Sequence, residues 1–254
     1  MPIYGQFWHD NAPTHAEIEG DTAFFVNDLF YDLTRTGASI PISDAEILPP
    51  VFPSKLIAIG LNYADHAAEH GNEVPPHPLM WLKAPSSLLA HGGTIEVAFP
   101  DHRTDHESEL AVVIGKRGKS IAEAEALDYV LGYTPAQDIS DRVIQRGESQ
   151  WARAKSLDTY TPLGPYIYTD ADPANLRVQC LVNGELKQDG HTRDLMFSIP
   201  RIIAFVSEAI TLEAGDVILT GTPAGVGALK DGDRVETRVG DFEPLVNQVK
   251  FASG

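Results

Sequence analysis

The sequence predicts a β-rich α+β fold with a small N-terminal unit. Short strand-like apolar runs outnumber helical patterns, and they do not alternate with helices as they would in a doubly wound α/β fold. A stiff connection at Pro49, Pro50 and Pro53 separates residues 1–50 from residues 51–254. A chain of 254 residues fits one large domain, or a main domain with a small appendage.

The predicted strands follow in chain order. Residues 22–26 and 29–33 are strand-like runs, and Asn27-Asp28 between them is a hairpin-turn signal. Residues 55–60 begin the main body as a strand. Further strands are predicted at 79–82, 94–97, 109–115, 129–136, 176–182, 216–220, 233–239 and 245–251. Asn183-Gly184 predicts a tight hairpin to residues 185–187.

Helices are fewer. Ser120 and Glu123 have capping-box spacing for a short helix that ends near Leu127. Ser198 is an N-cap candidate for a helix over residues 198–208. The isoleucines and valine of that segment follow helical spacing, so we expect this helix to pack against a sheet.

Composition excludes several classes of partner. The formal net charge of −17 repels phosphate backbones and anionic membranes, so nucleic acid is not an expected partner. No apolar stretch is long enough to span a bilayer and no signal-peptide pattern is present, so we expect a soluble, cytoplasmic protein without membrane contact. Cys180 stands alone, which excludes an intrachain disulfide, and its apolar neighbours predict a buried strand thiol.

Acidic residues mark a candidate metal site. Glu107 and Glu109 lie two apart in a predicted strand, so their carboxylates point to the same side. With Asp138, which ends the apolar run before it, they would offer the oxygen ligands that Mg²⁺ or Mn²⁺ prefers. A solvated strand edge is the alternative interpretation of the pair.

His66 and Glu69 are a candidate base pair. They lie three apart in a predicted helical turn, so they share a face and the carboxylate can orient the imidazole for general-base catalysis on water. A solvated helix pair is the alternative. The Gly- and Pro-rich residues 71–78 that follow suit an irregular loop, and we interpret them as a possible lid.

Other residues suit an anionic ligand. Lys155 is a candidate for charge stabilisation, with a surface lysine as the alternative. Arg142 and Gln145, three apart, would grip a carboxylate or carbonyl together unless Arg142 pairs with an acid such as Asp141. Thr222 lies in a glycine-rich segment, residues 221–227. That segment lacks a phosphate-loop ending and predicts either a pocket wall for a small carboxylate or a plain turn.

Taken together, the segments 60–69, 107–115, 132–142, 155–165 and 221–227 resemble the fumarylacetoacetate hydrolase family, and they occur in the family's order. The resemblance implies a mixed-sheet, rolled β core behind a small N-terminal domain (residues 1–50), with the catalytic domain over residues 51–254, and a homodimer.

The resemblance also implies roles for the candidate residues. Glu107, Glu109 and Asp138 match the ligands of a Mg²⁺, Mn²⁺ or Ca²⁺ ion, and His66 and Glu69 match the hydrolytic dyad. Lys155 matches the family's lysine near the metal. The family's substrate-contacting residues correspond here to Arg142, Gln145 and Thr222. The hydrolase that names the family has a fourth acidic ligand shortly before its catalytic histidine. Here the residues before His66 are Ile-Gly-Leu-Asn-Tyr-Ala and then Asp65, adjacent to the histidine, so the chain looks more like the smaller three-carboxylate members.

The expected function is cleavage of a C–C bond in a small anionic 2-oxo acid, by acylpyruvate hydrolysis or oxaloacetate-type decarboxylation. The cation and Lys155 would stabilise the enolate that cleavage leaves. Because an isomerase of the 2-hydroxyhepta-2,4-diene-1,7-dioate or 5-carboxymethyl-2-hydroxymuconate type uses a similar intermediate, isomerisation in aromatic catabolism is the first alternative. A non-enzymatic, metal-stabilised dimer is the second.

Overall fold

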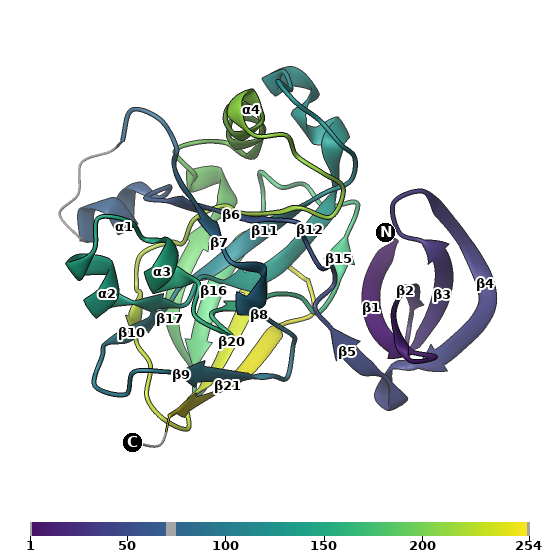
Figure 1. The fold of residues 1–254 in the computed structure, drawn as a ribbon, viewed down its shortest axis with the longest axis horizontal. Coiled ribbons are helices and arrows are strands. Elements are labelled where there is room, and N and C mark those ends of the chain that lie inside the picture. Colours follow the sequence, from purple (N-terminus) through teal and green to yellow (C-terminus); the bar gives the residue numbers. More distant parts are fainter. Residues whose placement is uncertain (1, 70–74, 253–254) are drawn as a thin grey trace.

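The computed structural model describes residues 2–69 and 75–252, and strands form most of its regular structure (Figure 1). The largest sheet contains β1 (Ile3–His9), β2 (Ala12–Glu19), β3 (Thr22–Asp28), β4 (Asp32–Pro41), β5 (Glu46–Leu48), β6 (Leu56–Gly60), β7 (Leu79–Lys83), β11 (Ser108–Ile114), β12 (Val130–Gln137), β15 (Ile167–Tyr168) and β18 (Val217–Leu219). Its order is β4-β3-β2-β1-β15-β12-β11-β18-β6-β7, with β5 paired to β1.

The N-terminal strands lie to one side of the main body and continue its sheet (Figure 1). The link is the antiparallel pair of β1 and β15, in which Ile3 lies opposite Tyr168 and Tyr4 opposite Ile167. Residues 1–50 are therefore joined to residues 51–254 by backbone hydrogen bonds as well as by the chain itself.

A second sheet has the order β17-β16-β20-β21-β9. It consists of β9 (Thr94–Val97), β16 (Arg177–Val182), β17 (Glu185–His191), β20 (Arg234–Val239) and β21 (Leu245–Phe251). The predicted hairpin between β16 and β17 is confirmed, because Asn183 and Gly184 form its turn with φ values of 53° and 80°. Smaller sheets join β13 (Ser140–Asp141), β10 (Thr104–His106) and β19 (Gly227–Ala228), and β14 (Thr161–Pro162) with β8 (Leu88–Leu89).

The sheets are mixed. Parallel pairs, β18 with β6 and β21 with β9, occur among antiparallel ones. Together with the small share of helix, these pairs confirm the predicted β-rich α+β fold with a mixed-sheet core.

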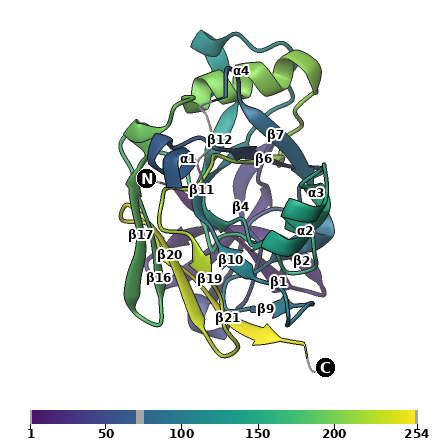
Figure 2. The same ribbon diagram turned by 90° about the vertical axis from the view of Figure 1, so that its left-hand side faces the viewer.

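Helices cover the sheets at two places. They are α1 (Ala64–Glu69), α2 (Arg142–Gly147), α3 (Ala152–Lys155) and α4 (Ile199–Ala209), with 3₁₀ turns η1 (Ile42–Asp44), η2 (Pro85–Ser87), η3 (Glu123–Tyr129) and η4 (Thr192–Asp194). Helix α4 forms as predicted: the Ser198 hydroxyl caps it by accepting from the Arg201 N–H at 3.3 Å. Helices α1, α2 and α3 lie on the side of the main body away from the N-terminal strands (Figures 1 and 2).

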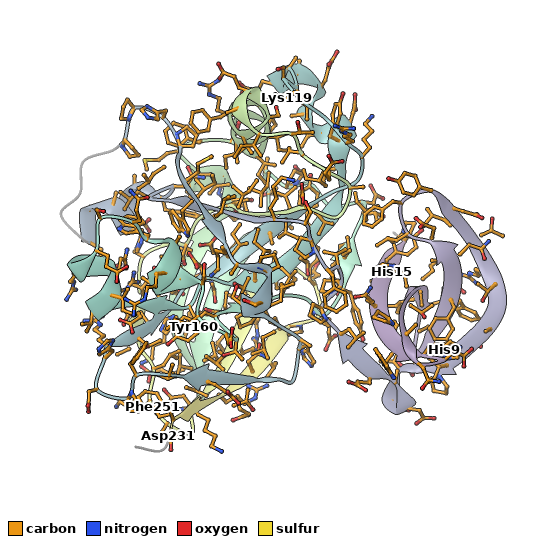
Figure 3. The ribbon with its side chains drawn as sticks, viewed as in Figure 1. His9, His15, Lys119, Tyr160, Asp231 and Phe251 are labelled. Atoms are coloured by element: carbon orange, nitrogen blue, oxygen red, sulfur yellow. The ribbon has the colours of Figure 1, made fainter. Side chains whose placement is uncertain are left out.

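The core lies on both faces of β11, all of whose residues are buried. Leu110, Val112 and Ile114 join the apolar cluster that includes the buried face of α4, whereas Ala111 and Val113 join a cluster on the opposite face. Side chains fill the interior of the main body, with Tyr160 among them (Figure 3). The alternation of β11 places Glu109 on the side of Ala111 and Val113.

The predicted N-terminal hairpin was wrong in its turn. Asn27 and Asp28 end β3, and the chain turns at residues 29–31 because the Asp28 carboxylate accepts from the Phe30 and Tyr31 N–H groups at 2.8 and 2.9 Å. Strands β1 and β2 were not predicted. Their two-residue turn, Asp10-Asn11 with positive φ at both positions, is a hairpin signal that the sequence carries.

The predicted capping box at Ser120 was also wrong. The helix there is the 3₁₀ turn η3, which begins at Glu123 without a side-chain cap. Ser120 has a φ of 51°, and its N–H and that of Ile121 are taken by Ser207 of α4. Tertiary hydrogen bonds therefore replace the local cap.

Candidate active site

Three acidic side chains meet at one end of the β11–β12 pair. Glu107 immediately precedes β11, Glu109 lies within it and Asp138 immediately follows β12, and the register places Ser108 opposite Gln137. The carboxylates of Glu107, Glu109 and Asp138 offer oxygens that all lie within 4.8 Å of one another. Because Glu107 is 4% exposed and Glu109 1% exposed, the interpretation of this pair as a solvated strand edge was wrong.

The two glutamates differ in their electrostatic surroundings. Burial alone would raise the pKa of Glu107, but the positive charges of Lys155 and Arg142 hold it below the ordinary range. Burial, and then the charges of Asp138 and Glu107, raise the pKa of Glu109 well above its ordinary value. The Gly221 N–H, which donates to Glu109 at 2.7 Å, only partly opposes this effect. Charge repulsion within the cluster therefore raises the pKa of Glu109 and not that of Glu107.

This cluster fits a divalent cation. It contributes only carboxylate oxygens, which are hard ligands of the kind that Mg²⁺, Mn²⁺ and Ca²⁺ prefer. A cation among them would also offset the repulsion that raises the pKa of Glu109. Glu107, Glu109 and Asp138 are therefore the residues that would hold it.

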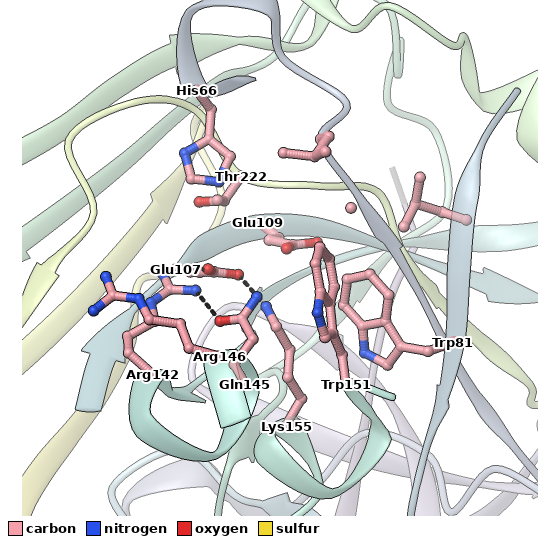
Figure 4. A pocket seen from close by; sticks show the side chains of 13 residues that line it. His66, Trp81, Glu107, Glu109, Arg142, Gln145, Arg146, Trp151, Lys155 and Thr222 are labelled. Carbon is pink, nitrogen blue, oxygen red and sulfur yellow. Dashed lines mark hydrogen bonds and ion pairs between the residues drawn. The ribbon is translucent and has the colours of Figure 1, made fainter. Parts of the chain in front are cut away.

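Lys155 is part of the same cluster. From the end of α3 its ammonium donates to Glu107 at 2.7 Å (Figure 4) and to Asp138 at 2.8 Å. Although burial would lower the pKa of Lys155, the charges of Asp138 and Glu107 raise it, so the side chain stays cationic. With 2% exposure it is not a surface lysine, and that alternative was wrong.

A second buried lysine was missed from the sequence. Lys83 ends β7 with its side chain inside the protein, where the ammonium donates to Asp138 and to the Tyr160 carbonyl at 3.0 Å. A lysine that closes an apolar strand, after Leu79-Met-Trp-Leu, was the available signal. Asp138 is therefore held between two ammonium groups.

Arg142 and Gln145 lie together on α2, as their spacing predicts. The Arg142 guanidinium donates to Gln145 at 2.7 Å (Figure 4), to Glu107 at 2.6 Å and to Asp105 at 2.8 Å. The alternative that Arg142 pairs with an acid is thus borne out, but the partners are Asp105 and Glu107 and not Asp141. The Asp141 carboxylate instead caps α2 by accepting from the N–H groups of residues 143 and 144, each at 2.9 Å.

His66 and Glu69 lie on one face of α1 above the carboxylates (Figure 4 shows His66). His66 Nδ1 is 3.4 Å from a Glu69 oxygen, and the Glu69 carboxylate also accepts from the Gly225 N–H at 3.3 Å. His66 is 6% exposed, so its imidazole is buried, whereas Glu69 is exposed and only this end of the pair is solvated. Its imidazole enters the cavity from the side opposite Lys155.

These side chains surround one cavity of about 290 Å³. Glu107, Glu109, Lys155 and residues of α2 form its polar part, while Trp81 and Trp151, packed edge to face with ring centroids 5.2 Å apart, form an aromatic wall (Figure 4). Arg146, also missed from the sequence, is exposed and lines the cavity next to Gln145.

Thr222 brings the glycine-rich loop into the wall. It is 3% exposed and lines the cavity, and its hydroxyl donates to the Ser108 carbonyl at 2.8 Å. Gly221 and Gly225 on either side have φ values of 103° and 97°, which L-residues rarely adopt. The loop therefore forms part of the cavity wall, and the interpretation as a plain turn was wrong.

Three further expectations concern Cys180, the suggested lid and membrane-spanning helices. Cys180 is a buried strand thiol in β16, as predicted, and burial raises its pKa to about 11. Residues 71–74 of the suggested lid lie outside the described residues. Within the described part of the chain, no helix combines the length and apolarity needed to cross a bilayer.

Comparison with known proteins identifies the class. The model of the fumarylacetoacetate (FAA) hydrolase C-terminal domain matches residues 55–250, so the chain belongs to the fumarylacetoacetate hydrolase family. It is 41% identical over 222 residues to the mitochondrial oxaloacetate tautomerase Fahd2a of Rattus norvegicus, covering 83% of this chain and 71% of that protein.

Two solved structures are similar over the full length. The 5-carboxymethyl-2-hydroxymuconate delta-isomerase of Mycobacterium smegmatis has a TM-score of 0.92 and 38% identity, covering 99% of this chain and 100% of that one. The 2-hydroxyhepta-2,4-diene-1,7-dioate isomerase of Mycobacterium marinum has a TM-score of 0.92 and 34% identity, covering 100% of both chains. Both support the predicted fold.

Proposed function

We propose that this protein is a divalent-cation-dependent enzyme that acts on a small 2-oxo acid through its enolate. One observation carries the proposal. The buried carboxylate cluster opens, through Glu107 and Glu109, onto the cavity that His66 and Lys155 also line. A base, a fixed positive charge and a set of cation ligands therefore face the same space.

The charge of the site suits a dianionic substrate. Glu107, Glu109 and Asp138 would hold the cation, which would supply Lewis-acid stabilisation of negative charge on substrate oxygens. Three carboxylates and a dication leave one negative charge, and the buried Lys155 and Arg142, whose pKa values are raised by the neighbouring carboxylates, outweigh it. The site thus attracts an anion despite the formal net charge of −17 on the chain.

His66 is the proposed proton carrier. Glu69 orients its imidazole, which removes a proton from the carbon next to the 2-oxo group and leaves an enolate. Lys155 and Arg142 stabilise the developing negative charge, while Gln145 and Thr222 orient the substrate. Return of the proton to oxygen or to another carbon gives a tautomer or an isomer, with no other reactant consumed.

Proton transfer is the reaction that the relatives favour, because the similar proteins are named as a tautomerase and as isomerases. Cleavage of a C–C bond, the first expectation from the sequence, is the second candidate. In hydrolysis His66 deprotonates a water that attacks the distal carbonyl, and the C–C bond breaks to release a carboxylic acid and the enolate. In decarboxylation CO₂ leaves and the same enolate is protonated.

The test is a panel of substrates with Mg²⁺ or with a chelator. Loss of enol absorbance from oxaloacetate measures tautomerisation, and pyruvate release from oxaloacetate, acetylpyruvate and fumarylpyruvate measures cleavage. We expect Mg²⁺-dependent turnover in the first assay. Absence of turnover in all of them, with Mg²⁺ raising the melting temperature, would favour the non-enzymatic dimer instead. The homodimer and the cytoplasmic location stay predictions.

A further inference from the structure

Two buried glutamines hold the segment that carries Glu107. The strand is interrupted between β10 and β11, and side-chain amides take the backbone N–H groups there. The Gln137 carbonyl accepts from the Glu107 N–H at 2.9 Å, and the Gln188 carbonyl accepts from the Ser108 N–H at 3.0 Å. Gln137 lies on β12, the strand paired with β11, so its contact with this segment is local to that pair. Gln188 instead extends from β17 of the second sheet.

Gln188 uses its full hydrogen-bonding capacity in this position. Its carbonyl also accepts from His106 Nδ1 at 3.1 Å, and its amide NH₂ donates to the Thr222 hydroxyl at 2.7 Å and to the Pro223 carbonyl at 2.8 Å. The Ser108 N–H must donate and the Pro223 carbonyl must accept, so the orientation of the amide is fixed. With 0% exposure, Gln188 contacts these partners in the interior.

The bonds close a ring between the metal-site segment and the pocket loop. Ser108 N–H donates to Gln188, Gln188 donates to Thr222, and Thr222 donates back to the Ser108 carbonyl at 2.8 Å. Thr222 lines the cavity, whereas Gln188 lies behind it and is not among the residues lining the cavity. The place of the Thr222 hydroxyl relative to Glu107 and Glu109 therefore depends on a residue outside the cavity.

We propose that Gln188 is a positioning residue of the active site: it fixes Thr222 against the segment that bears the carboxylates. The inference rests on the proposed function. Without the amide, Thr222 keeps its bond to Ser108 but loses the donor that fixes its other side, and Pro223 loses its partner. The Ser108 N–H and His106 Nδ1 lose their acceptor. Ligand binding therefore weakens through Thr222, while Gln137 still holds the Glu107 backbone and preserves cation binding.

A binding experiment tests this without turnover. Oxalate is an unreactive planar dianion that resembles the enolate of a 2-oxo acid, and its dissociation constant is measured calorimetrically with saturating Mg²⁺. Gln188→Met, Thr222→Val and the double variant form a mutant cycle. Gln179→Met, on the neighbouring strand β16 opposite Asp189, is the matched control.

Gln188→Met should raise the oxalate dissociation constant about tenfold in the natural background and less than about twofold in the Thr222→Val background. The Mg²⁺ dissociation constant without oxalate should stay within about twofold. Gln179→Met should leave both constants unchanged. If Gln188→Met does not fold, Gln188→Glu, which keeps the shape and loses the amide donors, takes its place in the cycle.

Two results would overturn the inference: an unchanged oxalate constant in Gln188→Met, or equal increases in both backgrounds, which would mean that Gln188 does not act through Thr222. Failure of the natural protein to bind oxalate with Mg²⁺ would be a different outcome. It would remove the proposed function, and this inference with it.

Discussion

Glu107 and Lys155 form a buried ion pair at the floor of the cavity, with the Lys155 ammonium 2.7 Å from a Glu107 oxygen. The same ammonium lies 2.8 Å from Asp138, so one lysine bridges two of the candidate cation ligands. Positive charge is thus built into the site beside the carboxylates. This arrangement should respond to pH, to substitution and to a bound cation.

Glu109 should make the effect of Mg²⁺ on stability depend on pH. Its raised pKa means that the folded, cation-free protein binds this proton more tightly than the unfolded chain, where the pKa is near the ordinary 4.5. Its contribution to stability is therefore present below that pH and is lost as the pH rises toward the folded-state pKa. Mg²⁺ binds the ionised form, so the stabilisation by Mg²⁺ should increase with pH.

Urea unfolding from pH 5 to pH 8, with a chelator or with saturating Mg²⁺, measures this difference in the free energy of unfolding. In Glu109→Gln the pH dependence of the difference should largely disappear, because the titrating group is gone. A stabilisation by Mg²⁺ that is the same at every pH in the natural protein would contradict the assignment.

His66→Ala should lower kcat by about 100-fold or more, because the proposed proton carrier is removed. The Mg²⁺ dissociation constant should change little, since His66 is not among the carboxylates that would hold the cation. His9→Ala, on β1 in the N-terminal strands, is the control and should be fully active (Figure 3). Undiminished turnover in His66→Ala would remove the base assignment.

Lys83→Met should destabilise the cation-free protein by about 3 kcal/mol, because it leaves Asp138 buried with one of its two ammonium partners missing. Mg²⁺ should restore part of this loss and therefore raise the melting temperature of Lys83→Met more than that of the natural protein. Lys55→Met removes a half-buried ammonium from the buried Asp216 and is a control for loss of a paired lysine away from the cavity. Equal Mg²⁺ effects in all three proteins would show that Lys83 is not coupled to the site.

Arg146→Gln should raise the KM for a dicarboxylate such as oxaloacetate about fivefold, because Arg146 lines the cavity and can face the distal carboxylate. The KM for a substrate with one carboxylate, such as acetylpyruvate, should change less than about twofold. Arg153→Gln on α3, which loses only an exposed pair with Glu148, is the matched control. Equal changes in both KM values would exclude Arg146 as a specificity residue.

Much of the site is predictable because its signals are local. Glu107, just before β11, and Glu109 within it lie two residues apart and come together as that spacing predicts. Helical spacing of three predicts the contacts of His66 with Glu69 and of Arg142 with Gln145. Bringing Asp138 and Lys155 to the same place required the family resemblance, since the pairing of β11 with β12 is not visible in either segment alone.

What was missed depends on tertiary structure. Gln188 looks ordinary along the chain, and Lys83 carries only the signal of a lysine that closes an apolar strand; the packing of their strands turns both inward. The wrong cap at Ser120 has the same origin, because α4 supplies hydrogen bonds that the local pattern assigned to a helix. The N-terminal turn was misplaced for a local reason instead, since an Asx turn at Asp28 competed with the Asn27-Asp28 signal.

The central claim is that Glu107, Glu109 and Asp138 bind one divalent cation, and calorimetric titration of the chelator-treated protein with Mg²⁺ tests it most directly. We expect one site per chain, with a dissociation constant that rises about 100-fold or more in Glu109→Gln and is unchanged in Glu96→Gln on the exposed face of β9. Absence of Mg²⁺, Mn²⁺ and Ca²⁺ binding to the natural protein, or equal binding to Glu109→Gln, would contradict the claim.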